Sequence, residues 1–138
     1  MVIDKNEVAV ANIILRNRKL DAETIEYAQY LKQQHLQNLA EAKKLAHKID
    51  IKPTTSKLSN SLQAQGKKDL KQISQTKKNA LALAYINAMI NGHKGALDII
   101  HSLEGDTNNS DLKNFLAATS KHVAHHLERA NEIKNHLA

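Results

Sequence analysis

Three of the eight histidines lie where a metal ion could be bound. His35, His93 and His126 each fall on the apolar stripe of a different predicted helix. They lie 14 residues after Asp21, about 17 after the expected bend at Thr76, and 15 after Asp111. At about 1.5 Å per residue these are similar heights, so the three imidazoles are expected to share one layer of the core. Imidazole is a common neutral ligand of zinc, copper and nickel. The spacing therefore predicts a transition-metal site, with Glu7 or a water molecule as the fourth ligand.

Other interpretations of the histidines stay open. A hydrogen-bonded polar layer would also place histidines in a helical core and would fix helix register without metal, and it is the favoured interpretation of the three. Di-iron bundles carry Glu-x-x-His on two helices, whereas here only Asp98 and His101 have comparable spacing, so ferroxidase chemistry is not expected. His122, His125 and His126 have the spacing of a surface metal cluster, but a solvated helix face is the favoured interpretation.

The positive charge of the chain is concentrated in one segment. Residues 51–78 hold seven lysines and one aspartate, which accounts for the whole formal charge of +6. Read as a helix, this segment presents lysines and a hydroxyl on one face, an arrangement that suits phosphate groups. Near an anionic bilayer each lysine contributes about 1 kcal/mol, and phosphoinositide head groups are the most highly charged targets of this kind. The predicted anion-binding residues are Lys67, Lys68, Lys71, Ser74 and Lys78.

Two alternatives compete for the lysine segment. Residues 51–78 contain no arginine and no aromatic residue, so bidentate base contacts and base stacking are both excluded and nucleic acid is a disfavoured partner. The second alternative is a solvated face that only keeps the protein in solution.

The elements that must position these residues are all helical. Apolar residues recur at helical spacing, and alternating β-branched runs are missing. Asp4 and Glu7 have the spacing of a capping box, and Gly66 and Gly105 stand where helices would end. The expected helices are 4–18, 21–48, a short 57–65, 67–103 with a bend near 74–76, and 111–137, which Asp111 would cap.

These helices predict one domain over residues 1–138. Its expected architecture is an all-α, antiparallel four-helix bundle with a long lysine-rich connection, residues 50–75, that carries the short extra helix. The longest apolar run, residues 80–90, is too short for a transmembrane segment. The chain has no cysteine, no glycine-framed serine, no glycine-rich phosphate loop and no HExxH motif. We therefore expect a non-enzymatic binding protein without a cofactor, with a transition metal at the histidines as the alternative.

Four segments resemble the bacterial domain of unknown function 4142 family. They are Glu7 in the first helix, the run IEYAQYLKQQH that ends at His35, the run YINAMINGH that ends at His93, and HHLE at residues 125–128. The resemblance covers about residues 5–135. Gln34, Leu81-Ala82 and Lys121-His122 depart from the residues usual in the family, which suggests a divergent use.

The resemblance implies a ferritin-like four-helix bundle of an exported protein with no established enzymatic activity. It maps the family histidines onto His35, His93 and His126. Export implies a secreted or periplasmic mature chain after signal removal, because residues 1–5 carry no leader sequence. The function expected first is peripheral binding of anionic phosphate-bearing surfaces, with metal binding by the buried histidines and a protein-interaction scaffold as alternatives.

Overall fold

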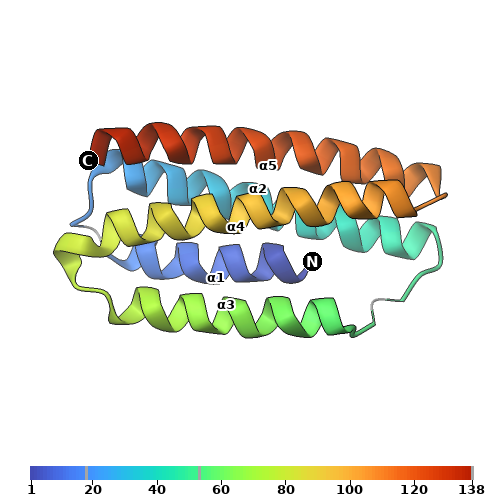
Figure 1. The fold of residues 1–138 in the computed structure, drawn as a ribbon, viewed down its shortest axis with the longest axis horizontal. Coiled ribbons are helices and arrows are strands. Elements are labelled where there is room, and N and C mark those ends of the chain that lie inside the picture. Colours follow the sequence, from blue (N-terminus) through green and yellow to red (C-terminus); the bar gives the residue numbers. More distant parts are fainter. Residues whose placement is uncertain (18, 53, 138) are drawn as a thin grey trace. The chain divides into compact units, whose positions relative to one another are not determined.

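The computed structural model describes residues 1–17, 19–52 and 54–137, and these residues form five helices and no strand. The all-α prediction is therefore confirmed. No helix among the described residues is long and apolar enough to cross a membrane. In chain order the helices are α1 (Val2–Arg16), α2 (Ala22–Lys48), α3 (Lys57–Gln75), α4 (Lys78–Asp106) and α5 (Ser110–Leu137) (Figure 1).

The chain divides into two compact units, Met1–Tyr85 and Ile86–Ala138, with the boundary inside α4. In the first unit α1 packs along both α2 and α3. In the second unit the remainder of α4 and α5 run in opposite directions and are joined by residues 107–109 (Figure 1). Fully buried apolar side chains include Ile14, Leu31 and Tyr85 in the first unit and Ile86, Ala130 and Ile133 in the second.

Helix α1 carries two carboxylates into the protein interior. Asp4 and Glu7 are both buried, on the same stripe as Val10, Ala11 and Ile14. The predicted capping box is therefore wrong: packing of the apolar stripe turns both side chains inward. The predicted end of this helix, residue 18, lies outside the described residues.

Helix α2 begins as its sequence predicts. The Asp21 carboxylate accepts hydrogen bonds from the backbone N–H and the hydroxyl of Thr24, both at 2.9 Å. Its predicted buried stripe is confirmed at Ala28, Leu31 and His35. The predicted stop signal after this helix, residue 53, lies outside the described residues.

Helix α3 runs through Gly66, so the predicted short helix ending at residue 65 is wrong. Gly66 is buried against Asn6 of α1, whose side-chain amide donates to the Leu62 carbonyl at 3.0 Å. A methyl group at position 66 would overlap the Asn6 side chain. The glycine therefore permits a close approach of two helices and does not end one.

The predicted helix over 67–103 is wrong at both ends. Helix α3 stops at Gln75 because Thr76 adopts an extended backbone, with its hydroxyl donating to the Gln72 carbonyl at 2.7 Å. Helix α4 starts at Lys78 and continues past Gly105 to Asp106. Gly105 therefore does not cap α4, contrary to the prediction. The capping role predicted at Asp111 is also wrong, because Asn109 accepts from the Leu112 backbone N–H at 2.9 Å.

The Asn6–Gly66 contact predicts opposite effects for two glycine-to-alanine changes. Gly66→Ala forces Asn6 to give up its bond to Leu62, and overpacking of this kind costs about 1–3 kcal/mol of unfolding free energy. Gly95→Ala is the matched control, because Gly95 is helical and nothing lies near its added methyl; it should stabilise by about 1 kcal/mol. Urea unfolding measures both, and equal stability of the two variants would contradict the contact.

Candidate metal centre

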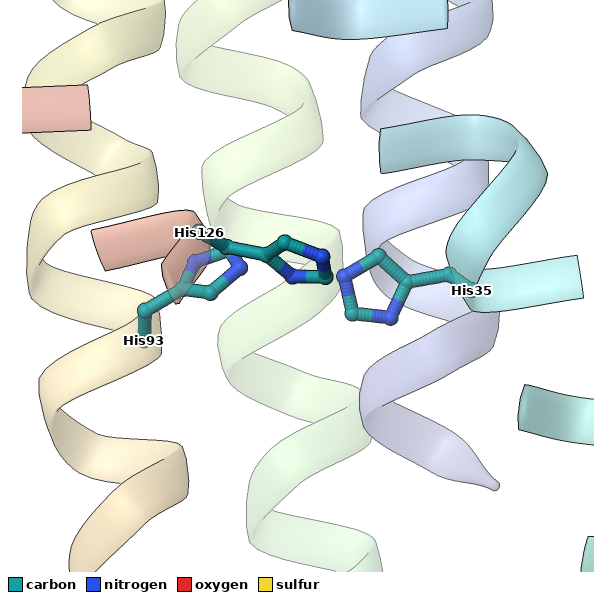
Figure 2. A group of neighbouring side chains, drawn as sticks. All are labelled: His35, His93 and His126. Carbon is teal, nitrogen blue, oxygen red and sulfur yellow. The ribbon is translucent and has the colours of Figure 1, made fainter. Parts of the chain in front are cut away.

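Two histidines lie together in the core of the second unit. His93 of α4 and His126 of α5 are each 2% exposed. Their ring centroids are 5.4 Å apart at an interplanar angle of 78°, and each has a ligand nitrogen within 4.8 Å of the other's. Figure 2 shows the two rings side by side, each projecting from its own helix. The helical periodicity that buries Met89, Ala96 and Val123 also turns both histidines inward.

The hydrogen bonding of His93 fixes which nitrogen can bind a metal. Its Nδ1 lies 2.7 Å from the Met89 carbonyl oxygen, one turn back along α4. A carbonyl oxygen only accepts, so Nδ1 must carry the hydrogen. In the neutral ring Nε2 then holds the lone pair, which is the electron pair a metal ion needs.

His35 shows the same arrangement in the first unit. Its Nδ1 lies 3.0 Å from Asp4 Oδ1, and the side-chain amide of Asn38 donates to the same oxygen at 3.0 Å. Burial acts to raise the pKa of Asp4, but the hydrogen bonds from His35 and Asn38 and nearby positive charge outweigh it and lower that pKa. An ionised carboxylate only accepts, so Nδ1 of His35 donates its hydrogen. In the neutral ring Nε2 then holds the lone pair, as in His93.

Metal-binding histidines almost always donate their second ring N–H to a carboxylate or a carbonyl oxygen. His35 and His93 have one such acceptor each, supplied by a different kind of group. Sequence reasoning predicted the histidines but missed Asp4 and Asn38. Asn38 lies three residues after His35 on the same helix face. This spacing could have indicated that both side chains bind one partner, Asp4.

Glu7 is the second buried carboxylate of the first unit. Its Oε2 has no hydrogen-bond partner among the described residues. Burial raises the pKa of Glu7 to about 7; the charge of His35 acts to lower it, while those of Asp69 and Asp4 raise it. Burial also raises the pKa of Tyr85 well above its usual range, and the charge of Glu7 adds to that shift. Glu7 thus shares an electrostatic environment with His35.

The predicted anion-binding residues divide between two helices. The exposed side chains of Lys67, Lys68, Lys71 and Ser74 all belong to α3, whereas Lys78 opens α4 after the break at Thr76. The prediction that all five share one helix is therefore wrong at Lys78.

The predicted surface histidine cluster is divided by burial. His126 is buried, whereas His122 and His125 are exposed on α5. The Asp98–His101 pair is exposed on α4. These positions leave the buried histidines as the stronger candidate for chemistry.

An all-helical protein with buried, acceptor-anchored histidines is the class that the fold and this site define. The chain belongs to the family described as Domain of unknown function (DUF4142), whose family model matches residues 3–133. No curated protein and no solved structure matches the chain.

Glu7 predicts a pH-dependent loss of stability. The pKa of Glu7 is about 7 in the folded state and 4.5 ordinarily, so the free energy of unfolding falls as the pH rises from 4.5 to 7. Above pH 7 the folded state holds a buried, ionised carboxylate, and the loss is complete. At about 1.4 kcal/mol per pKa unit, the raised pKa lowers the free energy of unfolding by about 3 kcal/mol above pH 7. Glu7→Gln should therefore stabilise the metal-free protein by about that amount at pH 8 and not at pH 4.

Urea unfolding across this pH range measures the effect. Glu128→Gln, at an exposed position of α5, is the control and should leave the profile unchanged. A gain from Glu7→Gln that is equal at pH 4 and pH 8 would rule out a buried, titrating carboxyl.

Proposed function

We propose that this protein binds a transition-metal ion through its buried histidines, with Nε2 of His93, one ring nitrogen of His126 and Nε2 of His35 as the three ligands. The observation that carries the proposal is that Nδ1 of both His35 and His93 already donates to an oxygen that can only accept. Such anchoring leaves Nε2 to a metal and holds the ring in one orientation.

The donor set selects the class of metal. Neutral imidazole nitrogens suit zinc, copper and nickel, whereas magnesium and calcium prefer oxygen ligands. Three neutral ligands leave the charge of a divalent ion uncompensated, so the fourth position suits the Glu7 carboxylate or a water molecule. In this role Glu7 would bind as the carboxylate and release its proton to solvent.

The proposal includes the finer architecture and setting that the sequence predicts. An antiparallel, ferritin-like four-helix arrangement would carry ligands from facing helices into a common core. We further propose a non-enzymatic protein of bacterial origin that acts in a secreted or periplasmic setting. These proposals rest on the family resemblance.

Zinc should raise the melting temperature of the wild-type protein. An ion that binds only the folded state at a hundred times its Kd adds about 2.7 kcal/mol of stability. His93→Gln should abolish most of this gain, while His125→Gln, an exposed neighbour on α5, should keep it. Differential scanning calorimetry with and without zinc, copper or nickel measures the shift.

The variants also assign the third ligand. His35→Gln should weaken zinc binding as His126→Gln does, because both remove one ligand. A wild-type melting temperature that none of the three metals changes would contradict the proposed function. Loss of binding in His126→Gln but not in His35→Gln would restrict the site to the second unit.

We propose anionic-surface binding as a second candidate function, because α3 presents an exposed basic face. Lys67 and Lys71 lie one turn apart, with Lys68 beside them, and Ser74 continues the same face. The single acid of α3, Asp69, is half-buried and accepts a hydrogen bond from Gln65 at 2.8 Å. Acidic lipids such as phosphoinositides are the proposed partner, and a protein-interaction scaffold is the remaining alternative.

Removal of three α3 lysines should abolish binding to anionic vesicles. At about 1 kcal/mol per lysine, the triple glutamine variant at Lys67, Lys68 and Lys71 should bind about a hundredfold more weakly. The control is a triple variant of equal charge at Lys43, Lys44 and Lys113, which are exposed on other helices. Co-sedimentation with phosphoinositide vesicles at low and high salt decides between them, and equal losses in the two variants would exclude a specific basic face.

A further inference from the structure

We infer that Asp4 is a positioning residue for His35, fixing the ring with its hydrogen on Nδ1 and its Nε2 as the ligand atom, and that Asn38 holds Asp4 in place for this task. The importance of this arrangement for metal affinity rests on the proposed function. The tautomer of His35 itself does not, and can be measured in the metal-free protein.

The geometry concentrates two hydrogen bonds on one oxygen. Oδ1 of Asp4 accepts from Nδ1 of His35 and from the amide of Asn38, each at 3.0 Å. His35 and Asn38 are three residues apart and therefore lie on one face of α2. A single carboxylate oxygen of α1 thus bridges one turn of the neighbouring helix, and the Asn38 amide helps to hold that oxygen against the imidazole.

Burial makes this arrangement rigid. The side chains of His35 and Asp4 are 5% and 6% exposed. A buried carboxylate that loses its hydrogen-bond donors carries a large desolvation cost, because water cannot replace them. If the His35 ring flipped, Oδ1 of Asp4 would lose one of its two donors, so the carboxylate opposes both rotation of the ring and the other tautomer.

Stability alone does not account for this network. Replacement of buried charged pairs by apolar residues of similar size is often neutral or stabilising. Asp4 also pairs through Oδ2 with the N-terminal ammonium of Met1 at 3.3 Å, which leaves Oδ1 to His35 and Asn38. The network therefore retains polar groups in a site that apolar packing could fill, which is typical of groups kept to orient a functional side chain.

The two anchored histidines differ in the nature of the acceptor. His93 donates to a neutral backbone carbonyl of its own helix, which every helix offers one turn back. His35 donates to a charged carboxylate from another helix. A carboxylate acceptor raises the basicity of the imidazole and strengthens its bond to a metal. His35 is therefore the histidine whose basicity as a metal ligand depends on another side chain, that of Asp4.

Nitrogen-15 NMR of histidine-labelled, metal-free protein at pH 8 tests the assignment. The wild type and Asp4→Asn should both show His35 with its hydrogen on Nδ1, because the asparagine oxygen still accepts. Asp4→Leu removes the acceptor and should shift His35 toward the Nε2–H tautomer. A wild-type His35 with its hydrogen on Nε2, or an unchanged tautomer in a folded Asp4→Leu variant, would overturn the inference.

Zinc affinity, measured by competition with a chromophoric chelator, provides a second readout. Loss of an outer partner of this kind typically weakens metal binding 10–100-fold, which is the result expected for Asp4→Leu. Asp4→Asn should lose less, and Asn38→Leu should fall between them. Asp98→Leu, at an exposed position of α4, is the control and should bind as the wild type does.

The two readouts separate the inference from the proposed function. If no variant binds zinc but the His35 tautomer follows residue 4, the metal proposal fails and the positioning role stands. If the wild type and Asp4→Leu bind zinc equally and share one tautomer, the metal proposal stands and the positioning role is wrong.

Discussion

The hydrogen on the imidazole Nδ1 is the feature on which the account of this protein depends. A neutral imidazole has one donor and one acceptor nitrogen, so the oxygen that takes the hydrogen also decides which nitrogen keeps its lone pair. In the first unit that oxygen belongs to Asp4, and in the second it is the carbonyl of Met89. Both acceptors are buried beside their histidine, and both leave Nε2 as the nitrogen able to bind a metal.

The packing of α1 supplies the acceptor in the first unit. The apolar stripe of this helix turns Asp4 inward, where it reaches His35, and Glu7 lies on the same buried stripe. Burial raises the pKa of Glu7, whereas the hydrogen bonds to Asp4 lower the pKa of that residue. Two carboxylates three residues apart thus respond oppositely to similar burial, because one has hydrogen-bond donors and the other has an oxygen without one.

Much of the fold could be predicted from the sequence, because helical periodicity reports burial directly. The inward positions of His35, His93 and His126 followed from spacing alone, and α2 begins where the sequence predicts. Asp4 and Glu7 did not, because their spacing fits both a capping box and a buried stripe, and only packing decides between them. Gly66 likewise fits both a helix end and a close helix contact, which depends on Asn6, sixty residues earlier in the chain. The bend predicted near 74–76 is a complete break between α3 and α4, because the backbone at Thr76 is extended and its hydroxyl bonds back to the Gln72 carbonyl.

X-ray absorption spectroscopy of the zinc-loaded wild-type protein tests the central claim most directly, since it reports the ligand atoms around the ion. The account predicts imidazole scattering from three histidines, with nitrogen at about 2.0–2.1 Å, and one further light ligand. A shell of oxygen atoms without imidazole scattering would contradict it, because the ion would then lie outside the buried histidines.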